Sequence, residues 1–272
     1  MLVATYLDRI GARHRDVASL DRRGLDDLAA EAYAAPPPRD FAGALTARGD
    51  TRSGAATISL IAEIKRRSPS KGELAPDLDP ADVARAYESG GASCLSVLTD
   101  SPYFGGSAED LKLARAAVGL AVLRKDFTVS PADLYDARIM GADAVLLIVA
   151  LLDDEELAGL HRIAGELGMA AVVEVHDEVE LERALETGAT LVGVNQRDLH
   201  TFEVDRARAM RVARQVPVGV LKIAESGVES AADVAALAQA GFDAVLVGEV
   251  LMRSGDRRAF TAELVGRTTS CG

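Results

Sequence analysis

The chain has 272 residues, of which 49% are hydrophobic, and its formal net charge is −12 at pH 7. This length suits one α/β barrel, which usually needs about 250 residues, and the apolar content argues against a disordered chain. The acidic balance excludes nucleic acid and membrane surfaces as expected partners, because both attract clustered Lys and Arg.

The cysteines and histidines show neither a disulfide framework nor a metal site. Cys94 lies in an apolar run and Cys271 near the end of the chain, and the four histidines are scattered without metal-ligand spacing. The apolar run 144–152 is far shorter than the roughly 20 residues that span a membrane. Charged residues interrupt the beginning of the chain, where a secretory signal would be apolar. We therefore expect a cytoplasmic protein without a metal site.

The first 55 residues are predicted to form a helical extension that precedes a barrel over residues 56–272. Amphipathic patterns predict three helices in it, over residues 2–13, 25–35 and 41–47. Three prolines at 36–38 end the second helix, and Gly49–Gly54 form a polar connector. Such an extension either plugs the bottom of the barrel, covers its active site, or only adds solubility.

Glycines at regular spacing mark the ends of helices. Each follows an alanine-rich helical pattern and precedes a short apolar run, as in Gly91-Ala-Ser-Cys-Leu and Gly141-Ala-Asp-Ala-Val, and the pattern recurs at Gly188 and Gly241. A glycine at this place ends a helix by adopting a positive φ. The apolar runs are too short for helices and do not alternate with polar residues. We interpret them as strands buried on both faces, as in parallel sheets.

Four more apolar runs lie between these, over residues 58–64, 120–124, 170–175 and 218–224. Eight strands that alternate with helices predict a closed (β/α)8 TIM barrel, with an open doubly wound sheet as the alternative. In such a barrel the active site lies at the carboxyl ends of the strands. The polar residues at those ends are therefore the candidate site residues.

Charged and polar residues lie at the ends of five strands: Glu63 and Lys65, Lys125, Glu174, Asn195 and Arg197, and Glu225 with Ser226. Because side chains alternate along a strand, Glu63 and Lys65 point to the same side. An unpaired charge at a buried strand end is unfavourable, so these groups must pair with each other and with a ligand. Such pairing spreads their pKa values, which acid–base catalysis uses. The alternative is a ring of salt bridges that only closes the top of the barrel.

Small residues follow the last two strands, where this fold commonly binds phosphate through backbone N–H groups. Ser226 and Gly227 follow one strand and Gly248 the other, with Glu249 next in the chain. The loop 66–72 is basic within an acidic chain. It is interpreted as a flap that folds over an anionic substrate, or else as a solvated surface loop.

Seven sequence motifs occur in order along nearly the whole chain. They are IAEIKRRSPSKG (61–72), LTD with YFGGS (98–107), LRKDF (123–127), VEV (173–175), VGVNQRDL (192–199), IAESG (223–227) and LVGEVLM (246–252). In these motifs, and in the earlier PPPRDF (36–41), the chain resembles the indole-3-glycerol-phosphate synthase family of tryptophan biosynthesis. The resemblance implies an enzyme that needs neither a metal nor an organic cofactor.

The resemblance also implies a reaction on a sugar phosphate. The substrate would be 1-(2-carboxyphenylamino)-1-deoxyribulose 5-phosphate, and the products indole-3-glycerol phosphate, carbon dioxide and water. Lys125 is implied as the acid that protonates the ketone oxygen, and Glu174 as the base for dehydration. Lys65 would pair with the substrate carboxylate, and the division of acid roles between the lysines stays open. A lysine near other cations, or partly desolvated, has a lowered pKa and becomes a better donor near neutral pH.

The other candidate residues receive supporting roles from the same resemblance. Glu63 is expected to orient Lys125 and the sugar hydroxyls, and Phe127 to pack against the anthranilate ring. Asn195 and Ser226 are expected to be catalytic, and together with Glu225 to place polar groups around the reacting carbon. The other residues are expected to bind the substrate: Ser68, Arg197, Gly227, Gly248 and Glu249. For Arg197 the alternative is pairing with a neighbouring carboxylate, Asp198 or Glu225.

Two other functions remain as alternatives. A phosphoribosylanthranilate isomerase would act on a different substrate and would give no reason for two strand-end lysines that face a carboxylate. A barrel that binds the phosphate ligand without turning it over is the second. Association with other enzymes of the tryptophan pathway is left open by the sequence.

Overall fold

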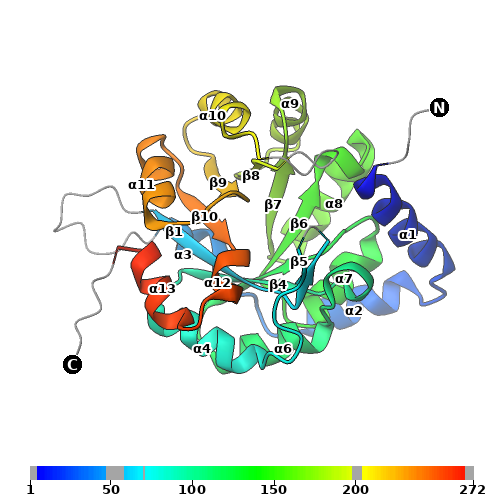
Figure 1. Cartoon of the computed structure of the whole chain (residues 1–272). Helices are drawn as coiled ribbons and strands as arrows, with labels where there is room; N and C mark the ends of the chain where they lie inside the picture. Colours follow the sequence, from blue (N-terminus) through cyan, green and yellow to red (C-terminus); the bar gives the residue numbers. More distant parts are fainter. Residues whose placement is uncertain (1–4, 47–57, 70, 198–203, 267–272) are drawn as a thin grey trace.

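A closed barrel of parallel strands forms the centre of the molecule, and helices surround it (Figure 1). The computed structural model describes residues 5–46, 58–69, 71–197 and 204–266. Around the barrel the strand order is β1-β10-β9-β8-β7-β6-β5-β4, so that β1 closes the cylinder against β10. The predicted (β/α)8 barrel is confirmed, and the open sheet is wrong.

The strands lie close to the predicted apolar runs. The barrel strands are β1 (Ser59–Ile64), β4 (Cys94–Leu98), β5 (Ala121–Lys125), β6 (Ala144–Ile148), β7 (Ala170–Val175), β8 (Leu191–Asn195), β9 (Leu221–Glu225) and β10 (Ala244–Val247). The predicted start of the seventh at Val218 is wrong, because Val218 lies fully exposed in a turn with Gly219. In the loop after β1, β2 (Arg67–Ser68) and β3 (Gly72–Glu73) form a small antiparallel sheet.

Eight helices cover the outside of the barrel within the described ranges: α4 (Pro80–Gly90), α6 (Ala108–Ala117), α7 (Pro131–Ile139), α8 (Asp154–Glu166), α9 (Glu178–Glu186), α10 (Arg206–Gln215), α11 (Ala231–Gln239) and α13 (Arg257–Leu264). Shorter helices lie in the loops: α5 (Ser101–Phe104), η2 (Val149–Leu151) and α12 (Glu249–Arg253). None of the described helices has the length and apolar character needed to cross a membrane.

Both ends of these helices follow from local sequence. Each of the eight begins after a Ser or Asp whose side chain accepts a hydrogen bond from a first-turn N–H: Asp79, Ser107, Ser130, Asp153, Asp177, Asp205, Ser230 and Asp256. Such caps satisfy N–H groups that have no partner inside the helix. The four glycines predicted to end helices all have positive φ, at Gly91, Gly141, Gly188 and Gly241. The chain thereby turns from each of these helices into the next strand.

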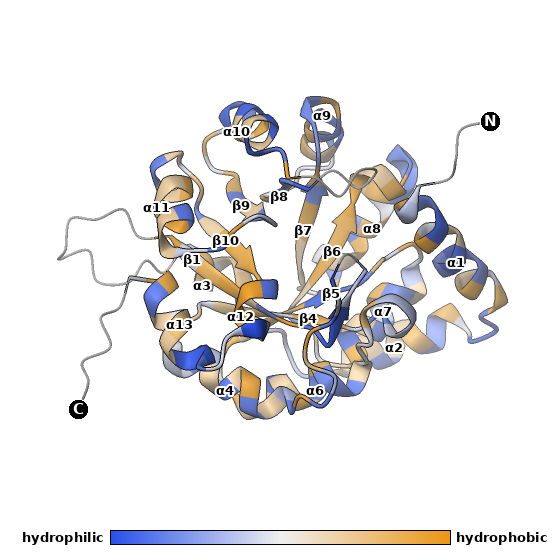
Figure 2. Ribbon diagram, viewed as in Figure 1, coloured by the Kyte–Doolittle hydropathy of each residue, from blue (hydrophilic) through white to orange (hydrophobic). Residues whose placement is uncertain are grey.

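Apolar side chains cover both faces of the barrel strands, which explains why the strand sequences do not alternate. Along β1, Leu60 and Ala62 pack towards the helices, whereas Ile61 packs inside the barrel with Leu123 and Leu246. Figure 2 shows the hydrophobic strands at the centre and hydrophilic residues on the outer surfaces of the helices.

The extension closes one end of the barrel and borders the other. It comprises α1 (Tyr6–Leu20), α2 (Leu25–Ala34) and α3 (Phe41–Thr46). Phe41 and Leu45 of α3 join the core inside the barrel, and the carbonyl of Leu45 accepts a hydrogen bond from Ser59 at the start of β1. Therefore α3 plugs the bottom. The first helix continues to Leu20, beyond the predicted end at residue 13, while its predicted start at residue 2 and the connector 49–54 lie outside the described residues.

Candidate active site

A cavity of about 360 Å³ lies at the carboxyl ends of the strands, a size typical of small-molecule sites. All the residues that sequence reasoning selected line it: Glu63, Lys65, Ser68, Lys125, Phe127, Glu174, Asn195, Arg197, Glu225, Ser226, Gly227, Gly248 and Glu249. They come from β1, β5, β7, β8, β9 and β10 and the loops that follow these strands. The barrel thus brings together groups that are up to 186 positions apart in the chain.

Lys125 lies between two carboxylates. Its Nζ is 3.2 Å from Glu174 Oε2 and 3.3 Å from Glu225 Oε2, and its side chain is 17% exposed. Burial lowers the pKa of Lys125, but the charges of Glu174, Glu225 and Glu63 outweigh burial and the pKa is raised. The lowered lysine pKa expected from the sequence is therefore wrong for Lys125, because carboxylates rather than cations surround it.

The two carboxylates beside Lys125 differ in pKa. Burial raises the pKa of Glu174, but Lys125 and His176 outweigh it, and the pKa of Glu174 is lowered. At Glu225 burial and the charge of Glu174 outweigh Lys125, so the pKa of Glu225 is raised. Neighbouring carboxyl groups with separated pKa values can divide the roles of ionised base and neutral partner.

Lys65 forms its ion pair with Glu63 rather than with the carboxylates beside Lys125. Its Nζ is 2.6 Å from Glu63 Oε1, and Ser96 Oγ donates a 3.5 Å hydrogen bond to Glu63 Oε2. Glu63 was expected to orient Lys125, but its direct partner is Lys65, and it acts on Lys125 only through its charge. The predicted common side of Glu63 and Lys65 is confirmed.

Two glycines make room for the buried carboxylates. A Cβ atom built on Gly193, within β8, would lie 2.1 Å from Glu225 Oε1. A Cβ atom on Gly248 would lie 2.3 Å from Glu63 Oε1. Sequence reasoning linked Gly248 only with phosphate and did not select Gly193, although a glycine inside a strand often marks a close approach.

The loop after β9 contains a residue with an unusual backbone conformation, and the helix after β10 begins with a carboxylate that lies near two cations. Ser226 has φ 67°, and among the described residues it is the one non-glycine with a positive φ. Strained backbone of this kind is concentrated at functional sites. The Glu249 carboxylate lies 3.9 Å from Lys71 Nζ and 3.8 Å from Arg253. Two cations therefore offset its charge beside the cavity.

The basic loop after β1 turns only some of its residues towards the cavity. Arg66 is bound to Asp110 at 2.8 Å, and Arg67 donates to backbone carbonyls of α5, so neither lines the cavity. Ser68 and Lys71 do line it. Two of the basic residues thus hold the loop in place, and one remains at the cavity.

The first helix contributes a wall that sequence reasoning did not assign to particular residues. Tyr6, Leu7 and Ile10 of α1 line the cavity. The Tyr6 ring packs edge-on against Tyr103, with 5.6 Å between the centroids. Their helical spacing along an amphipathic segment was the available signal, but it does not tell which surface the apolar face covers.

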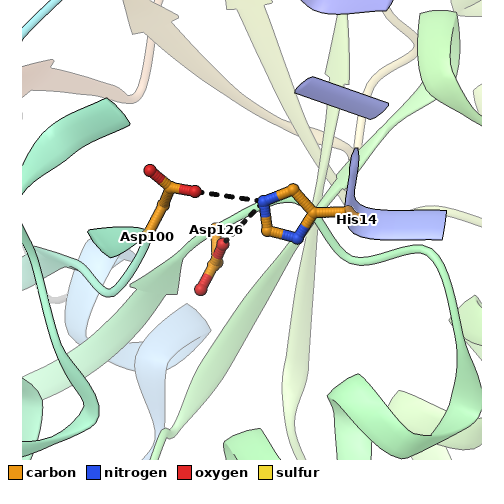
Figure 3. A group of neighbouring side chains, drawn as sticks. All are labelled: His14, Asp100 and Asp126. Atoms are coloured by element: carbon orange, nitrogen blue, oxygen red, sulfur yellow. Dashed lines mark hydrogen bonds and ion pairs between the residues drawn. The ribbon is translucent and has the colours of Figure 1, made fainter. Parts of the chain in front are cut away.

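His14 fastens α1 to the rim of the barrel (Figure 3). Its Nε2 is 3.1 Å from Asp100 Oδ2 and 3.9 Å from Asp126 Oδ1. These three side chains place potential metal ligands within 4.8 Å of one another. However, Asp100 also caps α5, and Asp126 pairs with Arg124 at 3.0 Å. Both carboxylates are thus already used in fixing the loops on which α1 rests.

Sequence comparison identifies the family to which the chain belongs. The family model described as indole-3-glycerol phosphate synthase matches residues 7–264. The chain belongs to the indole-3-glycerol phosphate synthase family. The family activity is a decarboxylating ring closure in tryptophan biosynthesis, so the resemblance and the function predicted from the motifs are confirmed.

Relatives of the same name cover most or all of the chain. The indole-3-glycerol phosphate synthase of Mycobacterium ulcerans is 51% identical over 276 residues, covering 100% of this chain and 98% of the relative. That of a Parafrankia species is 54% identical over 230 residues, covering 85% and 83%.

Solved structures with low sequence identity share the barrel fold. A 3-hexulose-6-phosphate synthase has TM-score 0.61 and 18% identity, covering 77% of this chain and 99% of its own. A thiamine phosphate pyrophosphorylase from Pyrococcus furiosus has TM-score 0.58 and 17% identity, covering 77% and 94%. At these identities the likeness concerns the fold alone.

Proposed function

We propose that this chain converts 1-(2-carboxyphenylamino)-1-deoxyribulose 5-phosphate to indole-3-glycerol phosphate with Lys125 as general acid and Glu174 as general base. The observation that carries this proposal is the position of the Lys125 ammonium group between Glu174 and Glu225, in a cavity that Lys65 also lines. A proton donor and an acceptor for it thus lie within hydrogen-bond reach at the mouth of one barrel.

Ring closure requires an anchored carboxylate and an acid. Lys65 binds the substrate carboxylate, exchanging part of its 2.6 Å contact with Glu63 for the new ion pair. As the aromatic carbon attacks the ketone, Lys125 donates a proton to the ketone oxygen. Because its pKa is raised, Lys125 carries this proton at neutral pH. The developing negative charge on the oxygen then draws the proton across.

Decarboxylation and dehydration complete the reaction. Carbon dioxide leaves, and the electrons of the broken bond restore the aromatic ring. The hydroxyl group then leaves as water after it receives a second proton from a lysine, and Glu174 removes a proton from the carbon beside the nitrogen. Asn195 Nδ2 donates a 3.0 Å hydrogen bond to Glu174 Oε1, which holds the base in place. The lowered pKa of Glu174 keeps it ionised for this step.

The walls of the cavity match the two ends of the substrate. Phe127 and Phe104, whose ring centroids are 6.2 Å apart, provide an apolar surface for the anthranilate ring. The phosphate would bind at the loops after β9, β10 and β1. Backbone N–H groups of the first two loops would donate to it, at Ser226, Gly227, Gly248 and Glu249. Side chains of the β1 loop, Ser68 and Lys71, would complete the site. Arg197 lines the same cavity and offers a further cationic group to the anionic substrate.

The proposal is tested with Lys125→Ala and Glu174→Gln in a fluorescence assay for indole-3-glycerol phosphate. Each variant should stay folded and lose about 10²–10⁴-fold in kcat, the usual contribution of a placed acid or base. Lys112→Ala, at an exposed lysine of α6, is the matched control and should retain full activity. Full activity of either site variant would contradict the assigned roles. Binding without product by the wild-type chain would favour a non-catalytic barrel, and turnover of only the isomerase substrate would favour an isomerase.

A further inference from the structure

A buried histidine lies behind the proposed base. His176 is 8% exposed and follows β7 directly. Its Nε2 is 3.5 Å from Glu174 Oε1, and its Nδ1 is 3.0 Å from Glu180 Oε2. Nε2 is fully buried and has no hydrogen-bond partner of good geometry among the described residues. A buried polar atom without such a partner is uncommon and calls for an explanation in function or strain.

The reaction itself consumes a proton. The substrate carboxylate leaves as neutral carbon dioxide, and the ketone oxygen leaves as water, so two protons are added to that oxygen. One proton is removed from carbon by the base. The balance is one proton taken from solvent in each turnover. While the substrate fills the cavity, this proton needs a route to the lysines that does not pass through the substrate.

We propose that Glu180 and His176 form a proton relay that connects solvent with Glu174 and, through Glu174, with Lys125. The groups are in sequence: Glu180 Oε2 to His176 Nδ1 is 3.0 Å, His176 Nε2 to Glu174 Oε1 is 3.5 Å, and Glu174 Oε2 to Lys125 Nζ is 3.2 Å. The Glu180 side chain is 17% exposed, whereas that of Glu174 is 2% exposed. The chain of groups therefore runs from the surface to the acid.

An imidazole suits this position because it accepts a proton at one nitrogen while it gives one from the other. Glu180 passes a proton to Nδ1, Nε2 passes one to Glu174, and Glu174 passes one to the lysine amine. Each transfer breaks one O–H or N–H bond and forms another. Water then restores the proton on Glu180, and movement of the ring proton from Nδ1 back to Nε2 resets the imidazole before the next turnover. Local structure fixes the geometry, because the backbone N–H of His176 donates a 2.7 Å hydrogen bond to the same Glu180 oxygen.

Several charged groups face the relay. Lys125 of β5 and Glu225 of β9 lie beside Glu174, and Asn195 of β8 donates to it. His176 and Glu180 do not line the cavity, so in this proposal they act through Glu174. Since the relay rests on the proposed base role of Glu174, its test has to distinguish the two.

The test compares His176→Gln and Glu180→Gln with His161→Gln, a matched control at a half-buried histidine of α8 away from the cavity. In weak, bulky buffer, kcat of His176→Gln should fall about tenfold or more, with KM within about twofold of wild type. Added imidazole should restore kcat by carrying the proton in place of the side chain. Glu180→Gln should show the same dependence on imidazole, and wild type and His161→Gln should show none.

Each outcome decides between the relay and a structural role. If His176→Gln keeps wild-type kcat, or loses it without responding to imidazole, the relay is overturned. Glu180→Gln gives the same decision should His176→Gln fail to fold, because the Glu180 side chain is partly exposed. Glu174→Gln distinguishes the relay from the base role on which it rests. If this variant is active, both the base role of Glu174 and the relay are contradicted. If Glu174→Gln is inactive and the kcat of His176→Gln does not respond to imidazole, only the relay is contradicted.

Discussion

The close approach of Gly193 to Glu225 makes a sharp test of how the barrel positions the charged groups that line its cavity. Gly193 does not have a positive φ, so alanine can adopt its backbone conformation. The added Cβ would lie 2.1 Å from Glu225 Oε1 and 3.2 Å from Val172 Cγ1. The carboxylate would have to move by more than an ångström, which breaks its 3.3 Å contact with Lys125.

The magnitude follows from two opposing effects. Overpacking a tight interior costs about 1–3 kcal/mol, whereas replacing a strand glycine by alanine gains about 0.5–1 kcal/mol. We expect Gly193→Ala to lower the free energy of unfolding by about 1–2 kcal/mol in urea denaturation, and to lower kcat because Lys125 loses one carboxylate. Gly159→Ala in α8, where nothing lies within 4 Å of the new Cβ, should instead gain about 0.5–1 kcal/mol and keep kcat. Wild-type stability together with wild-type kcat in Gly193→Ala would refute this steric account.

The remaining predictions concern the pKa of the Glu225 carboxyl group and the contacts by which His14 holds α1 against the barrel. Burial raises the pKa of Glu225 from 4.5 to about 7, so its ionisation costs stability as the pH rises through that range. Glu225→Gln should therefore match wild type in unfolding free energy below pH 4.5 and exceed it above pH 7, and an equal difference at both pH values would contradict the assignment. His14→Ala removes the 3.1 Å contact with Asp100 and the ring contact with Phe127. Loosening α1 should raise KM about 2–10-fold with little change in kcat, and an unchanged KM in steady-state assays would show that α1 does not support substrate binding.

The candidate site was largely predictable because its residues occupy positions that the fold class defines. Once eight buried strands are recognised, their carboxyl ends must meet at one rim, and Lys125, Glu174 and Asn195 are at those ends. The partners of each group were not predictable. Glu63 was assigned to Lys125 and instead binds Lys65, two residues further along the chain, whereas Lys125 on β5 contacts Glu174 of β7 and Glu225 of β9.

Groups outside the strand-end pattern were missed for the same reason. Gly193 is one of several glycines within apolar runs, and only the packed barrel shows that Glu225 occupies the space beside it. His176 follows Glu174 by two residues, but its proposed role depends on a contact with Glu180 of α9, and the cap of that helix sets the position of Glu180. Apolar positions of α1 signal a buried face without naming the surface that they cover.

The sequence by itself determined the architecture of this protein, since helix caps, helix-ending glycines and doubly buried strands are local signals that one chain segment carries alone. It also determined which side chains reach the rim. The tertiary structure decided the electrostatics: which carboxylate neighbours which lysine, and hence the raised pKa of Lys125 where the sequence suggested a lowered one. Charge interactions fall off with distance and depend on burial, and both quantities exist only after distant segments have packed together.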